Sequence, residues 1–393
     1  MKIAGIVCEY NPFHNGHKYH IEKTRENGAT HIVCAMSGNF VQRGECAVCD
    51  KWSRAKAAVL SGADLVVEIP TVWACSSAEN FARASVKLLS ALHIDMLSFG
   101  CETDNSALLQ NAAKAVDSPL ISEKVKSSVS SGLTYPAALQ KAVSEVFGKE
   151  TASVLELPNN TLAVEYIRQK EKICAGFELF PIKRMASFHG DSTPANDYFS
   201  SASAIRKIEQ TESILPYLPL EIYNELKELE AKGLYPCNIK NANRVVIAAL
   251  RAMTLNEIKA FMPDENGLAE RIFSKSRSSE NVAELIKSVK VKSYTEAAVR
   301  RAVMLCFLRI PKELSKSEPP YIKILAANKK GFEILRERPP LLPVITQKSQ
   351  TDKLSKFGKT VYELECECTD KFSLFSKKIP GCSREQTSPI IVL

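Results

Sequence analysis

The stretch that decides the fold of this chain is Gly5-Ile6-Val7-Cys8-Glu9-Tyr10-Asn11-Pro12-Phe13-His14-Asn15-Gly16-His17. Its apolar beginning predicts a buried strand, Pro12 favours a tight turn, and a helix is predicted from residue 15 to about residue 27. Gly16 allows a ligand to approach the backbone closely. His14 and His17 are three residues apart, so they share one face of the first helical turn. The stretch therefore predicts a strand, a turn and a helix start that carries two imidazoles.

Two imidazoles beside the free N–H groups of a helix start favour an anion. Such a cradle is suited to the charge that develops on a triphosphate attacked at its α-phosphorus. A helix that merely carries two histidines is the structural alternative, but the strand, the proline and the glycine around them favour a functional role. Zinc binding by His14 and His17 is a further alternative, although no nearby cysteine or carboxylate completes a ligand set.

The first half of the chain alternates strand-like and helix-like segments. Strands are predicted at residues 3–7, 31–36, 65–69 and 96–99, with helices at 15–27, 50–61 and 77–92 between them. This order predicts the α/β class, with a doubly wound parallel sheet. Ligands of such sheets bind at the carboxyl ends of the strands, where the two histidines lie.

From about residue 205 helical patterns dominate, at residues 221–232, 243–252, 255–260, 282–289 and 295–308. We therefore expect two domains with a boundary near residues 205–215. Residues 1–210 form the first predicted domain, and residues 211–393 form a mainly helical second domain. The tail, residues 360–393, is a candidate edge strand or cap.

Composition limits the class of protein. The 393 residues carry a net charge of +8, which fits a polyanionic partner such as ATP or RNA, although a basic surface without a specific partner gives the same number. No apolar run is long enough to cross a bilayer, and the N-terminus lacks the pattern of a signal peptide. Twelve cysteines without a repeating frame predict reduced thiols and a cytoplasmic location. Cys46 and Cys49 are interpreted as incidental thiols rather than half a zinc site or a redox pair.

The pattern His-x-Gly-His after a first strand resembles the signature of the nucleotidylyltransferase and class I aminoacyl-tRNA synthetase superfamily. The longer string from Glu9 to His17 resembles one family within it, the bacterial tRNA(Met) cytidine acetate ligases. Residues 36–45, 50–55 and 62–70 are similar to the same family, so the resemblance extends along most of the chain.

The resemblance implies that residues 1–210 are an ATP-binding catalytic domain with a Rossmann-like nucleotidylyltransferase fold, and that the mainly helical domain, residues 211–393, is the candidate for tRNA binding. It also implies the site residues. The implied catalytic residues are His14, His17 and Arg184. The implied nucleotide-binding residues are Val7, Cys8, Glu9, Tyr10, Asn11, Pro12, Phe13, His14, Asn15, Gly16, His17, His20, Gly100, Asn159, Asn160, Arg184, Met185, Ser201, Ser203 and Arg206. Asn159 or Asn160 is also a candidate helix N-cap, and a serine N-cap is the structural alternative for the loop at residues 200–206.

The reaction that the resemblance implies has two steps. Acetate attacks the α-phosphate of ATP, with Mg²⁺ carried by the triphosphate, and gives acetyl-adenylate and pyrophosphate. The exocyclic amine of the wobble cytidine of elongator tRNA(Met) then takes the acetyl group, which gives N4-acetylcytidine and AMP. Two alternatives stay open at this point: a nucleotidylyltransferase acting on a small metabolite or coenzyme precursor, and an ATP-sensing RNA-binding module without catalysis.

Overall fold

The computed structural model of the chain describes residues 1–184, 198–262 and 267–393. Met185, which the resemblance assigns to the nucleotide, lies outside these residues.

The centre of the molecule is an eight-stranded sheet with the order β10-β8-β5-β2-β1-β6-β7, in which β9 pairs with β8. The strands are β1 (Ile3–Cys8), β2 (His31–Ser37), β5 (Leu65–Ile69), β6 (Met96–Cys101), β7 (Glu178–Lys183), β8 (Ile322–Ala327), β9 (Val344–Ile345) and β10 (Ile391–Val392). Every pair is parallel except β5 with β8. A separate antiparallel hairpin joins β3 (Phe40–Val41) to β4 (Glu45–Cys46).

Alternate residues of the central strands face two different cores. In β2, Ile32 and Cys34 pack with α1 (Asn15–Glu26), α2 (Lys51–Leu60) and α11 (Leu220–Ala231), whereas Val33 and Ala35 pack with α4 (Ala78–Ala91) and α9 (Pro158–Lys172). Helices therefore cover both faces of the sheet, which confirms the predicted doubly wound α/β class.

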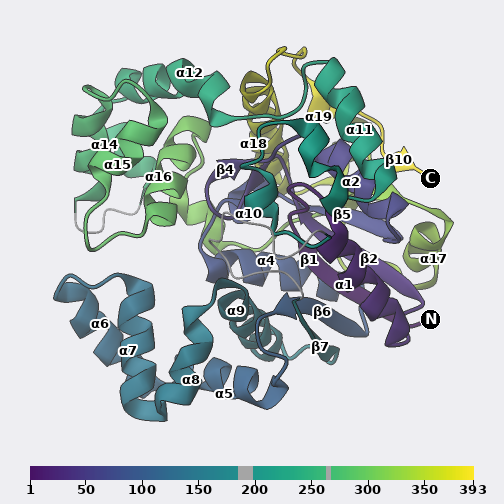
Figure 1. Cartoon of the computed structure of the whole chain (residues 1–393), viewed down its shortest axis with the longest axis horizontal. Helices are drawn as coiled ribbons and strands as arrows, with labels where there is room; N and C mark the ends of the chain where they lie inside the picture. Colours follow the sequence, from purple (N-terminus) through teal and green to yellow (C-terminus); the bar gives the residue numbers. More distant parts are fainter. Residues whose placement is uncertain (185–197, 263–266) are drawn as a thin grey trace.

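Most of the remaining helices form two groups, an insertion and a bundle (Figure 1). An insertion between β6 and β7 has a small core of its own and contains α5 (Ser106–Val116), α6 (Pro119–Ser130), α7 (Tyr135–Phe147) and α8 (Lys149–Ser153). A bundle gathers at another end of the molecule and contains α12 (Ile239–Ala252), α13 (Leu255–Phe261), α14 (Leu268–Ser276), α15 (Val282–Val289) and α16 (Glu296–Leu308). The rest are α3 (Thr71–Ala74), α10 (Ala202–Ile205), α17 (Lys329–Glu337), α18 (Lys356–Phe372) and α19 (Arg384–Thr387), with short 3-10 turns at Val154–Glu156, Thr211–Tyr217, Lys312–Lys316, Lys348–Lys353 and Ser373–Phe375.

The late part of the chain returns to the sheet. Strand β8 pairs with β5, and β10 pairs with β8 as an edge strand, so residues after 211 supply strands as well as the five helices predicted there. The edge strand expected in the tail is confirmed. Strand β8 was not expected, because a short apolar run between Pro320 and Pro339 has no periodicity that separates a buried strand from a buried helix.

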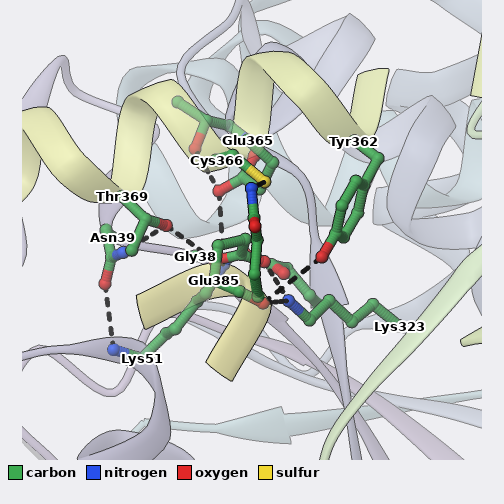
Figure 2. A network of polar contacts seen from close by, with 12 residues as sticks. Gly38, Asn39, Lys51, Lys323, Tyr362, Glu365, Cys366, Thr369 and Glu385 are labelled. Atoms are coloured by element: carbon green, nitrogen blue, oxygen red, sulfur yellow. Dashed lines mark hydrogen bonds and ion pairs between the residues drawn. The ribbon is translucent and has the colours of Figure 1, made fainter. Parts of the chain in front are cut away.

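A buried charged network joins the late chain to the first half (Figure 2). Lys51 Nζ of α2 lies 2.5 Å from Glu68 Oε1 of β5, 2.6 Å from Glu385 Oε2 of α19 and 3.4 Å from Glu365 Oε1 of α18. Lys323 of β8 pairs with the other oxygen of Glu385. Burial raises the pKa of Glu68 to about 8. Burial also opposes ionisation of Glu385, but Lys51 and Lys323 outweigh it and lower its pKa to about 2.

Candidate active site

The start of α1 is closed by its own two histidines. His14 is the N-cap, and its Nδ1 accepts a hydrogen bond from the Gly16 N–H at 3.1 Å. His17 Nδ1 accepts from the His14 N–H at 3.2 Å, and the two rings are stacked with centroids 3.6 Å apart. Since both Nδ1 atoms act as acceptors, each neutral ring carries its proton on Nε2. The fold therefore fixes both imidazoles as Nε2–H donors.

His20 continues the same face of the helix one turn later. Its Nε2 lies 2.9 Å from Ser98 Oγ of β6, and Ser98 Oγ lies 2.8 Å from Thr24 Oγ1. His20 is thus held against the neighbouring strand, so β1, α1 and β6 together position a row of three imidazoles.

Two arginines supply positive charge to this row. Arg184 directly follows β7, its N–H donates to the Cys101 carbonyl at 3.0 Å, and its side chain packs over Gly100, where a Cβ would lie 3.4 Å from Arg184 Cγ. Arg206, which follows α10, donates to the Asn11 carbonyl at 2.9 Å. The Arg184 side chain therefore lies against Gly100 at the carboxyl ends of β6 and β7, at a distance where an added Cβ would make an ordinary van der Waals contact.

The imidazoles are neutral in this setting. Burial, followed by the charges of Arg184 and Arg206, lowers the pKa of His14 to about 3. Burial and Arg184 lower the pKa of His20 to about 4, and burial, His14, Arg184 and His20 lower that of His17 well below its ordinary value. A site with two arginines and the neutral Nε2–H donors of His14 and His17 has a strong preference for an anion.

Several polar atoms in this region are buried without a partner. Among the described residues, no group lies within hydrogen-bonding distance of His14 Nε2, Asn11 Nδ2 or Ser200 Oγ. Leaving such an atom unsatisfied costs about 1–3 kcal/mol. Since Asn11 Oδ1 is fixed by the Val48 N–H at 2.8 Å, the amide is held with its donor side free. These atoms indicate the place of a ligand.

The serine loop at residues 200–206 has a structural role: it supplies a serine N-cap, which was the alternative to phosphate binding. Ser201 Oγ accepts from the Ala204 N–H at 3.2 Å as the N-cap of α10, and it lies 3.0 Å from Ser203 Oγ. The predicted phosphate contacts of Ser201, Ser203 and Arg206 stay predictions.

The asparagines at the start of α9 do not cap that helix. Its N-cap is Leu157, so the predicted asparagine cap is wrong. Asn160 Oδ1 instead accepts from the Glu102 N–H at 2.8 Å, and Asn159 Nδ2 donates to Glu102 Oε1 at 2.6 Å. The asparagines therefore hold the loop after β6. The Asn160 side-chain oxygen accepts from an N–H group of that loop, and not from the N–H groups at the start of α9.

Most side chains of residues 7–13 are buried in the core and support the site indirectly. The side chains of Cys8, Tyr10 and Phe13 belong to the core, and Val7 is half-buried, so the predicted nucleotide contacts of this part, including Pro12, depend on its backbone. Asn15 Nδ2 donates to the Tyr198 and Pro216 carbonyls at 3.1 and 2.9 Å, which ties α1 to the chain after residue 198.

Sequence reasoning missed two supporting residues. The Arg54 guanidinium donates to the Glu9 carbonyl at 2.6 Å and to the Ser37 carbonyl at 3.1 Å, although Arg54 is 2% exposed. Glu45 binds Arg206, with Nη2 and Oε2 3.2 Å apart. The similarity of residues 36–45 and 50–55 to the family was the signal that could have drawn attention to both.

A basic stretch in the helical half, formed by Lys287, Lys290, Lys292, Arg300 and Arg301, divides into two parts. Lys287, Lys290 and Lys292 are exposed. Arg300 pairs with Glu45, and Arg301 donates to the Gln42 carbonyl at 3.4 Å, while burial lowers its pKa. Only the lysines of this stretch therefore lie fully at the surface.

Within residues 1–184, 198–262 and 267–393, no three His, Cys, Asp or Glu side chains are grouped to hold a metal ion. None of the helices described there is long and apolar enough to cross a membrane.

Comparison with known proteins identifies the family to which this chain belongs. The model of the family HIGH Nucleotidyl Transferase matches residues 1–387, which defines the class. A tRNA(Met) cytidine acetate ligase of Thermoanaerobacter sp. (strain X514) is 38% identical over 410 residues, and one of Clostridium perfringens is 33% identical over 413 residues, each with full coverage of both chains. The chain belongs to the tRNA(Met) cytidine acetate ligase family, which confirms the family and the kind of enzyme predicted from sequence.

Solved structures agree with this assignment. The crystal structure of Thermotoga maritima TmcAL in the apo form has a TM-score of 0.95 at 29% identity, and its complex with alpha-thio ATP has a TM-score of 0.93 at 28% identity. Both cover the whole of each chain.

Proposed function

We propose that this chain activates acetate with ATP and transfers the acetyl group to the wobble cytidine of elongator tRNA(Met). The observation that carries the proposal is the meeting of three neutral histidines with Arg184 and Arg206 at the carboxyl ends of β1, β6 and β7. The names of the relatives, and the ATP analogue in the Thermotoga maritima structure, support ATP and tRNA(Met) as substrates.

The first step needs charge stabilisation rather than a protein nucleophile. The carboxylate oxygen of acetate forms a bond to the α-phosphorus, and the bond from that phosphorus to the bridging oxygen of pyrophosphate breaks. The Nε2–H groups of His14 and His17, with Arg184, donate to the phosphate oxygens on which charge develops. Arg206 and the hydroxyls of Ser201 and Ser203 hold the outer phosphates. His20, Gly100, Asn159 and Asn160 line the nucleotide side of this proposed site.

Magnesium fits this site as a partner of the triphosphate. The Glu9 carboxylate accepts a hydrogen bond from the Gln42 N–H at 3.0 Å. The Glu102 carboxylate accepts hydrogen bonds from Asn159 and Asn160 of α9. Both carboxylates therefore already have partners within the protein. Mg²⁺ bound to the phosphates would neutralise part of the charge of the leaving pyrophosphate.

The second step needs a tRNA surface, for which the bundle α12–α16 is the proposed place. Residues 239–309 contain 13 Lys and Arg against 7 Asp and Glu, a net charge of +6 out of +8 for the whole chain. Phosphate contacts by such a segment supply affinity, and the anticodon base is unstacked into the catalytic pocket. We accordingly propose residues 1–210 as the catalytic part and residues 211–393 as the part that binds tRNA, acting in the cytoplasm.

One experiment tests the proposal. The protein is incubated with ATP labelled in the α-phosphate, with acetate and with tRNA(Met), and the products are separated. The proposal expects AMP, pyrophosphate and acetylated cytidine, each dependent on acetate. If AMP forms without dependence on acetate, the proposal that the protein is an acetate ligase is rejected. Nucleotide transfer to a small acceptor supports the metabolite nucleotidylyltransferase, and ATP binding without pyrophosphate release supports the ATP-sensing RNA-binding module.

A further inference from the structure

One carboxylate connects the candidate ATP site to the helical bundle. Glu45 of β4 accepts from Arg206 Nη2 through Oε2 at 3.2 Å, and its Oε1 accepts from Arg300 of α16. The three side chains are 24–29% exposed, so solvent screens this trio less than a fully exposed surface pair. Arg206 and Arg300 are far apart in sequence and meet only through Glu45.

The hairpin that carries Glu45 is seated directly on α16. Gly44 has φ +73, and a Cβ there would lie 2.5 Å from the backbone nitrogen of Arg301. No side chain fits in that space, so the hairpin and the helix backbone touch (Figure 1). Any shift of α16 therefore moves Glu45 with it.

The same hairpin also touches the first stretch. The Gln42 N–H donates to Glu9 Oε1 at 3.0 Å, and the Val48 N–H donates to Asn11 Oδ1 at 2.8 Å. Arg206 Nη1 donates to the Asn11 carbonyl at 2.9 Å. The hairpin thus lies between α16 and the strand exit that precedes His14, with contacts to both.

We propose that Glu45 is a positioning residue that orients Arg206 for the triphosphate and connects this arginine to α16. The proposal rests on the proposed function for the identity of the ligand. The trio of two arginines and one carboxylate keeps a net positive charge, so an anion is still favoured at Arg206. Without the Glu45 carboxylate, the Asn11 carbonyl is the one partner that the described contacts leave to Arg206, and its guanidinium has more freedom to lose when nucleotide binds.

The test measures the Kd of a magnesium-saturated α,β-methylene ATP analogue by calorimetry. The proteins are the wild type, Glu45→Gln, Arg206→Gln and the double variant. Glu45→Gln is expected to raise Kd about fivefold, since the ion pair is replaced by at most a hydrogen bond to a neutral amide, and to have no further effect in the Arg206→Gln background. Glu296→Gln is the matched control, because Glu296 also accepts from Arg300 but has no contact to Arg206 among the described residues. This control is expected to bind like the wild type.

Three results overturn the proposal. Equal effects of Glu45→Gln with and without Arg206 mean that Glu45 acts by holding the hairpin. Tighter binding by Glu45→Gln means that Glu45 competes with the phosphates for Arg206. A Kd like that of the wild type means that Glu45 does not matter for the nucleotide. Binding of the analogue needs neither acetate nor tRNA. The test of Glu45 therefore still applies if the protein does not acetylate tRNA. If the analogue does not bind the wild type, the proposed function itself is contradicted.

Discussion

The imidazole rings of His14 and His17 lie stacked, and each forms half of the cap that starts α1. The same two side chains therefore have a structural and a chemical role that a simple alanine replacement would remove together. His14 binds the Gly16 N–H through Nδ1 and leaves Nε2 without a partner among the described residues, whereas His17 receives the His14 N–H. Separating the two roles requires substitutions that keep the cap.

His14→Asn and His17→Gln are such substitutions, since asparagine is a preferred N-cap and glutamine at the third helical position completes a capping box. Both variants are expected to keep the thermal stability of the wild type and to lose about 100- to 1,000-fold in kcat for AMP formation, as when an oxyanion donor is removed. His14→Ala is expected to lose activity and also about 1 kcal/mol of stability. Near-normal turnover of both capped variants would remove these histidines from the catalytic role.

Nucleotide binding is expected to take up protons. The pKa of His14 is about 3 and that of His20 about 4, so both rings are neutral near pH 7 in the free protein. A bound triphosphate favours the charged form and raises these pKa values toward the working pH. Below about pH 7 the complex therefore holds more protons than the separate partners, and affinity increases as pH falls.

The measurement is calorimetric titration with a magnesium-saturated ATP analogue, whose γ-phosphate is already deprotonated, in buffers of different ionisation enthalpy. Net uptake at pH 6.5 is expected to shrink as the pH rises and to be smaller in His14→Asn than in the wild type. Proton release, or a heat that does not depend on the buffer, contradicts this reading of the site.

Whether a structural feature can be predicted from the sequence depends on whether it is set by residues that are close together in the chain. The strand exit, the two histidines on one helix face and the alternation of the first sheet strands are set by neighbours in sequence, and a short window displays them. The pairing of β8 with β5, the contact of Arg206 with Glu45 and the contact of buried Lys51 with Glu385 each join chain segments more than 150 residues apart. In the sequence Arg300 is one of several basic residues of the helical half, and only the fold shows it pairing with Glu45.

Lys51 offers a test of how the late chain is held. Its ammonium group lies against Glu68, Glu365 and Glu385 inside the protein, where an ionised carboxylate that loses a cationic partner is costly. Lys51→Met is expected to lower the free energy of unfolding by about 3–5 kcal/mol. Lys56→Met is the matched control on the same helix, because Lys56 pairs at 2.5 Å with the half-exposed Glu225, and should cost less than about 1 kcal/mol. Urea unfolding followed by circular dichroism measures both, and similar losses in the two variants would show that the buried network contributes no more than a surface pair.

The exposed lysines of the bundle give the last prediction. Each Lys that contacts a phosphate of RNA releases counterions on binding, so the logarithm of the association constant falls with the logarithm of salt concentration by about 0.7–0.9 per contact. Replacing Lys287, Lys290 and Lys292 together by glutamine is expected to weaken tRNA(Met) binding and to reduce that slope by about 2, with no change in the Kd of the ATP analogue. The control triple replaces Lys353, Lys356 and Lys359, which are equally exposed but lie outside α12–α16. Filter binding across a salt series measures the slopes. An equal loss in the two triples means that net charge alone attracts the RNA, while a loss confined to the control moves the tRNA surface away from the bundle.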